Sequence, residues 1–371
     1  MAGLELRLSK AGLRRRFPRL LPVLVGAALV TEPVGAYRFF GWNLVDQVTS
    51  LGAAKWADES LPLRFRSVEN DAFPAILPEE AWREGVRRGF AAWEDVPTSR
   101  MEILLEEGTV SADGWRDRNG INTIGFVAPE EGFNAAVANL FIKDGVIVEC
   151  DITVGAIRWN QLAEGTAREE LVRRARAMTL HEVGHCLGLT HSAANPVWRV
   201  WPDAPSEWTP SVTGGDAPED VRTFFPNSKM AYANSYGYPG LHPDDITGVS
   251  LLYPAAGFLE GAGTIRGRIV FADGSPASFA VVSSAEGGAP GSPFGPHTFT
   301  DAHGQFVLEG LRPGRTMLWI HPYLVPAGKA FSNTDVATPA MHHTMLWPLV
   351  EAGRTLDLGE IRVTRDDGDA P

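Results

Sequence analysis

The sequence predicts a chain in two parts, an α+β domain followed by an all-β sandwich. The chain has 371 residues, which is enough for two ordinary domains. Up to about residue 256, segments of helical periodicity alternate with strand-like segments. After that point, short strand-like runs are separated by Gly, Pro and Asp, as in a β-sandwich. We expect a signal peptide at 1–36, a lead-in segment at 37–60, the α+β domain at 61–256, and the sandwich with a disordered tail at 257–371.

The N-terminal residues have the pattern of an export signal. A basic region at 14–19 precedes an apolar run at 20–30, and small residues follow up to Ala36, where cleavage is expected. The alternative is an uncleaved anchor, although a run of this length is short for a bilayer span. We therefore expect a secreted or extracytoplasmic protein, in the periplasm or cell envelope if bacterial, with no stable membrane span after cleavage.

Composition excludes several classes of protein. Hydrophobic residues make up 44% of the chain and charged residues 21%, which is globular composition. The formal net charge of −12 argues against nucleic acid as the main partner. The only cysteines are Cys150 and Cys186, so at most one disulfide forms. The sequence leaves open whether they are bridged or are two buried thiols.

The sequence predicts two long helices and one short helix in the α+β domain, and in the first of them Trp82, Val86, Phe90 and Trp93 recur at helical spacing. In the first, Pro78 and two glutamates suit a helix start. In the second, Thr166 and Glu169 have capping-box spacing and Gly188 stands where a helix should stop. The predicted helices cover 78–94, 167–187 and 243–252, and the predicted strands cover 61–68, 101–105, 121–127, 136–142 and 146–154.

The sandwich is predicted from short strand-like runs divided by turn residues. Its scattered histidines, including His303 and His321, are expected to be solvated rather than to bind a metal, because metal sites need convergent spacing. The predicted strands cover 264–271, 278–283, 305–308, 316–321 and 356–363.

One motif carries chemistry: residues 181–191 read His-Glu-Val-Gly-His-Cys-Leu-Gly-Leu-Thr-His. His181 and His185 are four apart, so on a helix they share one face and can hold one metal ion. Gly188 lets the chain turn back, so that His191 can supply a third nitrogen. Three neutral imidazoles leave the fourth position of a zinc ion open for water, which is the catalytic arrangement. Glu182 can then serve as the general base. The alternative is a structural or inactive zinc site, but no fourth protein ligand is evident, since Cys186 points about a quarter turn away.

These residues resemble the metzincin clan of zinc endopeptidases, whose motif is followed by a methionine turn. The matching downstream run is Ser-Lys-Met-Ala-Tyr at 228–232, so the resemblance assigns Met230 to the apolar floor beneath the histidines. The runs at 122–126, 148–152 and 241–253 are similar to matrixin catalytic domains. The part after residue 257 is similar to carboxypeptidase regulatory-like, transthyretin-like β-sandwiches. The resemblance implies a twisted sheet over a zinc-binding helix.

The chain also departs from the matrixin pattern. The excursion between His191 and Met230 holds 38 residues, and no histidine precedes His181 to build a second zinc site. No cysteine precedes Cys150, which excludes latency through an upstream cysteine. Similarity to astacins and serralysins at Tyr232 implies that its hydroxyl contacts the zinc or the developing oxyanion. The alternative for Tyr232 is a ring packed near Tyr253.

The sequence therefore predicts a secreted zinc endopeptidase that acts on proteins or peptides with one catalytic Zn²⁺. Asp113, Asp117 and Asp144 are calcium candidates without a loop signature, so we expect a solvated surface there. The rival interpretation is an exported binding protein with an inactive metzincin scaffold, in which the sandwich is the working module. The intact Glu182 argues against that rival, because a scaffold needs no general base. Trp198, Trp201 and Trp208 either wall a substrate cleft or pack the excursion.

Overall fold

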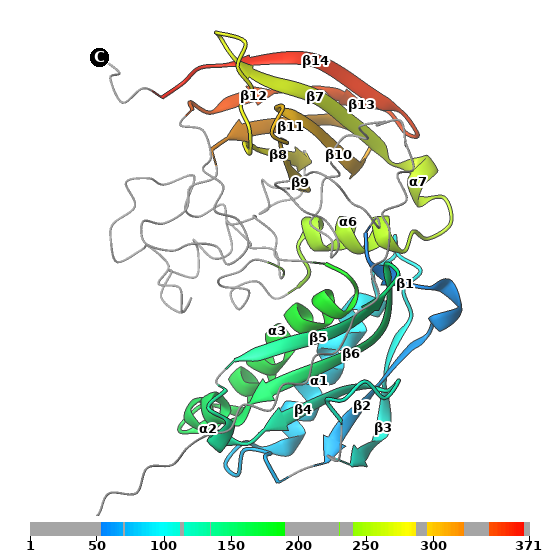
Figure 1. Cartoon of the computed structure of the whole chain (residues 1–371), viewed down its shortest axis with the longest axis vertical. Coiled ribbons are helices and arrows are strands. Elements are labelled where there is room, and N and C mark those ends of the chain that lie inside the picture. Colours follow the sequence, from blue (N-terminus) through cyan, green and yellow to red (C-terminus); the bar gives the residue numbers. More distant parts are fainter. Residues whose placement is uncertain are drawn as a thin grey trace, which may run out of the picture. The chain divides into compact units, whose positions relative to one another are not determined.

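The computed structural model describes residues 53–69, 71–111, 115–133, 135–189, 230, 240–286, 295–322 and 341–366 (Figure 1). The predicted signal peptide and most of the lead-in segment lie outside these residues. So do the long excursion with its three tryptophans, and both His191 and Tyr232.

The first part of the chain is an α+β unit built on a six-stranded sheet. The strand order is β1-β6-β4-β2-β3, and β5 also pairs with β6. Every pairing is parallel except that of β5, which runs antiparallel to β6. The bounds are β1 Lys55–Trp56, β2 Leu63–Glu69, β3 Ile103–Ser111, β4 Asn122–Val127, β5 Ala136–Lys143 and β6 Val146–Gly155.

Asp144, one of the calcium candidates, lies in the turn between β5 and β6. Asp144 and Gly145 have φ angles of 53° and 79°, as a two-residue hairpin turn requires. Asp144 is exposed. The aspartate therefore suits the turn, and its solvated position agrees with the sequence expectation.

Two long helices pack against each other and against the sheet (Figure 1). These are α1 Glu79–Glu94 and α3 Arg168–Cys186. Glycines at Gly85 and Gly89 allow the close approach, because a Cβ at Gly85 would lie 2.5 Å from the Cβ of Ala175. The apolar positions predicted for α1 are all buried, namely Trp82, Val86, Phe90 and Trp93. A short helix that the sequence analysis missed, α2 Ala156–Ala163, precedes α3.

The predicted start of the second helix was wrong in its detail. The N-cap residue of α3 is Ala167, which makes no side-chain capping bond, so Thr166 and Glu169 do not form a capping box. The end of the helix is as predicted: Leu187 is the C-cap and Gly188 takes a positive φ of 103°.

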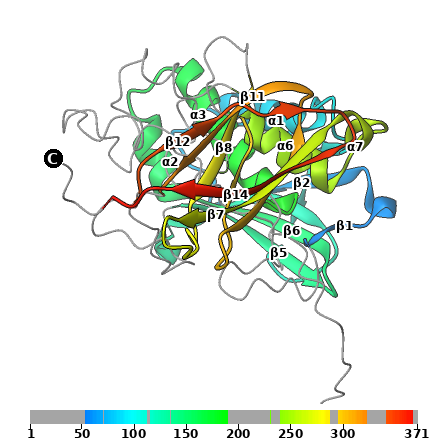
Figure 2. The same ribbon diagram turned by 90° about the horizontal axis from the view of Figure 1, so that it is seen from above.

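The second part is an all-β unit with two sheets around its own apolar core. One sheet has the order β10-β7-β14, and the other has the order β12-β11-β8-β9 with β13 also on β11. Figure 2 shows β14 beside β7, with which it pairs in parallel. The bounds are β7 Gly263–Phe271, β8 Val281–Glu286, β9 His297–Phe299, β10 Gln305–Leu311, β11 Gly314–His321, β12 Thr344–Leu346, β13 Leu349–Val350 and β14 Thr355–Val363.

Two sequence expectations for this unit fail. The strand predicted at 278–283 lies at Val281–Glu286 instead, because Phe279 adopts a positive φ of 62° in a turn. His321 is fully buried rather than solvated, and its Nε2 lies 3.2 Å from the hydroxyl of Ser283.

Two further helices follow along the chain, α6 Pro243–Leu252, whose Val249 and Leu252 belong to the core of the first part, and the short α7 Phe258–Gly261. The bounds of α6 match the predicted helix. Among the helices that the structure describes, none is long and apolar enough to cross a membrane.

Candidate metal centre and active site

The two histidines of the helical motif point their Nε2 atoms at each other. His181 and His185 lie one turn apart on α3, and their Nε2 atoms are 3.2 Å apart. Two nitrogens that each lie about 2.0–2.1 Å from a tetrahedral zinc ion are separated by about 3.3 Å. The pair therefore has the spacing of two ligands on one metal ion.

A backbone carbonyl orients the ring of His185. The Nδ1 of His185 lies 2.8 Å from the oxygen of Leu189, which can only accept a hydrogen bond. The proton of a neutral ring is thus assigned to Nδ1, and Nε2 keeps its lone pair. Metal-binding histidines commonly have such a partner on the other ring nitrogen.

Glu182 lies on the same turn of α3 and is buried, with 5% of its surface exposed. Its carboxylate accepts a hydrogen bond from the backbone N–H of Ala138 on β5. Burial raises the pKa of the Glu182 carboxyl to about 8, and the hydrogen bond from Ala138 acts in the opposite direction. The carboxylate is therefore held between the histidine helix and the strand at the edge of the sheet.

Met230 lies against the same helix. The residue is buried, and a Cβ placed on Gly184 would overlap its sulfur atom. Gly184 is the residue before His185, so the methionine packs directly against the helix turn that carries the two imidazoles.

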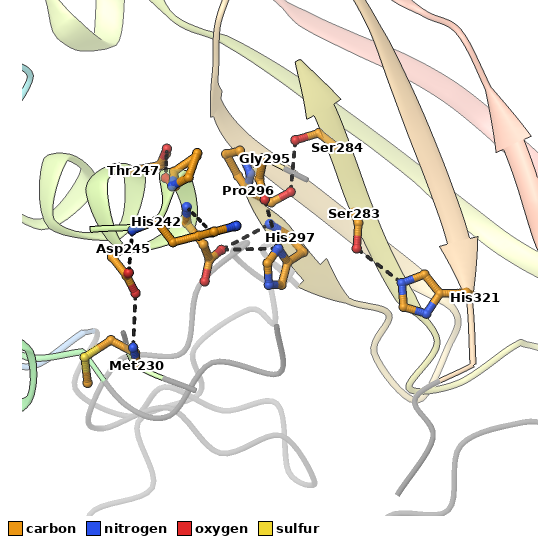
Figure 3. A network of polar contacts seen from close by, with 12 residues as sticks. Met230, His242, Asp245, Thr247, Ser283, Ser284, Gly295, Pro296, His297 and His321 are labelled. Atoms are coloured by element: carbon orange, nitrogen blue, oxygen red, sulfur yellow. Dashed lines mark hydrogen bonds and ion pairs between the residues drawn. The ribbon is translucent and has the colours of Figure 1, made fainter. Parts of the chain in front are cut away.

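Asp245 on α6 fixes the backbone of Met230 (Figure 3). One oxygen of Asp245 accepts from the N–H of Met230 at 3.2 Å, and the other accepts from the N–H of His242 at 2.8 Å. The Nδ1 of His242 in turn accepts from the N–H of Asp244 at 3.1 Å, which completes a capping box at the start of α6. This role of Asp245 was not predicted from the sequence, although the His-x-x-Asp spacing before an apolar run is its signal.

The start of α6 also contacts the sandwich. The backbone N–H of His297 on β9 donates to Asp244 at 3.2 Å, and Figure 3 shows His297 facing this helix end. The side chains of Asp244 and His297 are both buried.

The two cysteines form a disulfide, which settles the alternative that the sequence left open. Cys150 on β6 and Cys186 at the end of α3 are bonded, with their Cα atoms 5.6 Å apart. The bond ties the sheet to the residue that follows His185.

The described residues hold part of the predicted site. No group of three or more histidine, cysteine, aspartate or glutamate side chains is placed to hold a metal ion within the ranges that the structure describes. The third predicted ligand, His191, and the predicted catalytic Tyr232 lie outside those ranges. Among the calcium candidates, Asp117 is exposed like Asp144, and Asp113 lies outside the residues that the structure describes.

Comparisons with known proteins add little to this geometry. No protein-family model and no curated protein matches the chain. A minor pilin of Streptococcus agalactiae is 17% identical, with 30% of this chain and 47% of that chain covered at a TM-score of 0.19. Catechol 1,2-dioxygenase from Pseudomonas arvilla is 12% identical, with 30% and 56% covered at 0.19. A 5-hydroxyisourate hydrolase of Klebsiella pneumoniae is 18% identical, with 27% and 90% covered at 0.19. The chain thus spans less than two thirds of the pilin and of the dioxygenase, and likeness of this degree carries no argument about function.

Proposed function

We propose that the protein is a secreted zinc endopeptidase of the metzincin type, in which His181, His185 and His191 hold one zinc ion. The observation that carries the proposal is the 3.2 Å separation of the Nε2 atoms of His181 and His185, with the buried Glu182 on the same helix turn. When bound there, zinc would polarise the scissile carbonyl and lower the pKa of a water molecule to about 7.

Glu182 moves the proton in this proposal. Its carboxylate takes a proton from the attacking water and returns it to the leaving amine, so the residue ends each cycle ionised. A cation held by the neighbouring imidazoles would lower the pKa of Glu182 from the value that burial alone produces, because opposite charge favours the ionised form. The hydrogen bond from the backbone N–H of Ala138 fixes the orientation of the Glu182 carboxylate.

The substrate is expected to lie along β5. Among the described strands, β5 pairs only with β6, so none of these strands occupies its second edge, and we expect an extended peptide to pair there. Pairing through the backbone is insensitive to sequence, so side-chain pockets would set selectivity. In this proposal the scissile bond would lie beside Ala138 and therefore beside Glu182, whose carboxylate accepts from the Ala138 N–H.

The disulfide supports export. Disulfides persist in oxidising compartments and are rare in the cytosol. Cys150 and Cys186 are both buried, so the bond belongs to the core rather than to a reactive surface.

The test is chelator-sensitive cleavage of casein and of a peptide library by the purified mature protein. Cleavage should stop on removal of zinc and return with added zinc. Glu182→Ala should abolish turnover while one equivalent of zinc remains bound. Glu170→Ala is a matched control, because Glu170 lies on the same helix and pairs with Arg173 and Arg174 at the surface. A wild-type protein that binds zinc but cleaves neither substrate would contradict the proposal and favour the binding-protein scaffold.

A further inference from the structure

The last backbone carbonyls of α3 have no partner within the helix. The turn after the helix supplies partners for two of them: the N–H of Gly188 donates to the His185 carbonyl at 2.9 Å, and the N–H of Leu189 donates to the Gly184 carbonyl at 3.0 Å. This is the Schellman pattern, with glycine at the position of positive φ. The carbonyls of Cys186 and Leu187 remain, and at a buried helix end they need partners from elsewhere.

Two side chains from distant parts of the chain supply those partners. The indole Nε1 of Trp56 donates to the Cys186 carbonyl at 2.7 Å. The hydroxyl of Tyr253 donates to the Leu187 carbonyl at 2.8 Å and accepts from the backbone N–H of Trp56 at 3.0 Å. Both side chains are buried. Burial raises the pKa of Tyr253, so its hydroxyl keeps the proton that it donates.

The hydrogen bonds of Trp56 and Tyr253 hold the same turn that orients His185, a predicted metal ligand. The turn from Cys186 to Leu189 carries the Leu189 carbonyl, which lies 2.8 Å from the Nδ1 of His185. The carbonyls of Cys186 and Leu187 are therefore held from outside the helix in the same turn that places the partner of His185. A shift of this turn would move the Leu189 oxygen relative to the imidazole.

We propose that Trp56 and Tyr253 are positioning residues for the metal ligand His185. They act through the backbone of residues 186–189, which sets the orientation and the tautomer of the imidazole. The inference rests on the proposed function, because it takes His185 to be a zinc ligand. Trp56 in β1 and Tyr253 at the end of α6 are thereby added to the residues that support the metal ligands.

Tyr253→Phe tests the inference with little change in volume. The substitution leaves the Leu187 carbonyl and the Trp56 N–H without their partner in apolar surroundings, so the turn must move to find others. Loss of an outer-shell partner typically weakens metal binding by about 10–100-fold, and we expect the zinc dissociation constant to rise by at least about tenfold. The measurement is competition for zinc against a chelator of known affinity.

Ser250→Ala is the matched control. Ser250 lies on α6 close to Tyr253, is fully buried, and makes hydrogen bonds to Thr98 and to the Ile246 carbonyl. Its loss should lower stability without changing zinc affinity by more than about twofold, because its hydrogen bonds go to Thr98 and to the Ile246 carbonyl and not to the turn at the end of α3. Circular dichroism of the metal-free proteins checks that each variant is folded.

A second readout does not depend on bound metal. In the metal-free wild type, ¹⁵N NMR of the imidazoles should show His185 with its proton on Nδ1, and Tyr253→Phe should shift that tautomer population. Trp56→Phe should shift it too, so the test survives if one variant fails to fold. Folded variants with wild-type zinc affinity and an unchanged tautomer would overturn the inference. A wild-type protein that takes up no zinc would instead contradict the proposed function, and this inference with it.

Discussion

Cys150 lies in β6 and Cys186 is the last residue of α3, and the disulfide between them fastens the sheet to the residue next to His185. The bond closes a loop with a sequence separation of 36. The chain-entropy model assigns about 4 kcal/mol to a loop of that length.

The first prediction concerns this disulfide. Replacing both cysteines with alanine should lower the free energy of unfolding by about 2–5 kcal/mol, because the unfolded chain regains the entropy that the bond removes. Urea unfolding of the variant and of the wild type measures the difference. Treatment with a reductant should lower the unfolding free energy of the wild type to that of the variant. An unfolding midpoint of the wild type that is the same with and without the reductant would contradict this prediction.

The second prediction concerns Gly188. Its φ of 103° is unfavourable for other residues by about 1–2 kcal/mol, and a Cβ there would also overlap the carbonyl oxygen of Ala54. Gly188→Ala should therefore destabilise the protein by more than that amount, as measured by thermal unfolding. Gly165→Ala is the control: its φ is 67°, and nothing lies within 4 Å of an added Cβ. Equal losses in the two variants would show that the contact with Ala54 has no role.

The third prediction is a pH dependence of stability that originates at Asp151. Burial raises the pKa of Asp151 from 3.8 to about 7; hydrogen bonds from Thr123 oppose the rise, and the charge of Glu149 adds to it. The folded state therefore binds more protons than the unfolded state between those two values. The contribution of Asp151 to the free energy of unfolding is therefore fully present below about pH 4 and is lost as the pH rises towards 7.

Asp151→Asn removes this titration while keeping an oxygen that can accept from Thr123. The fall in unfolding free energy between about pH 5 and about pH 8 should be smaller in the variant than in the wild type. Asp144→Asn is a control at the exposed hairpin turn, where asparagine also adopts a positive φ, and it should keep the wild-type slope. Identical slopes in Asp151→Asn and the wild type would exclude Asp151 as the source.

The fourth prediction concerns Tyr232, which lies outside the described residues. If its hydroxyl stabilises the oxyanion, Tyr232→Phe should keep the fold and the zinc while turnover falls roughly a hundredfold. The readout is turnover on a cleaved peptide, with zinc content measured on the same sample. Unchanged turnover would favour the alternative of a ring that only packs near Tyr253.

Local patterns in the sequence were enough to predict the main helices and part of the site. The helical spacing of Trp82, Val86, Phe90 and Trp93 shows which face of α1 is buried. The bounds of α6 also match the predicted helix at 243–252. The pair His181 and His185 is also local, because one turn of a helix brings the two rings together.

Long-range contacts account for what the sequence could not predict. The strand Lys55–Trp56 is too short to show a period, and it lies within the segment predicted as a lead-in. Trp56 and Tyr253 meet the end of α3 only because the fold brings three distant segments together. Ala138 reaches Glu182 through its backbone N–H, and no side-chain pattern can reveal a backbone donor.

The proposed zinc ion is held by two histidines of α3 and by His191, with its fourth position open. A crystal structure of the zinc-loaded protein, with anomalous data at the zinc edge, would locate the ion and its ligands. We predict one peak about 2.0–2.1 Å from the Nε2 atoms of His181 and His185 and from a ring nitrogen of His191, with no fourth protein ligand and with Glu182 beside it. A fourth ligand from the protein, or a His191 turned away from the metal, would contradict the account.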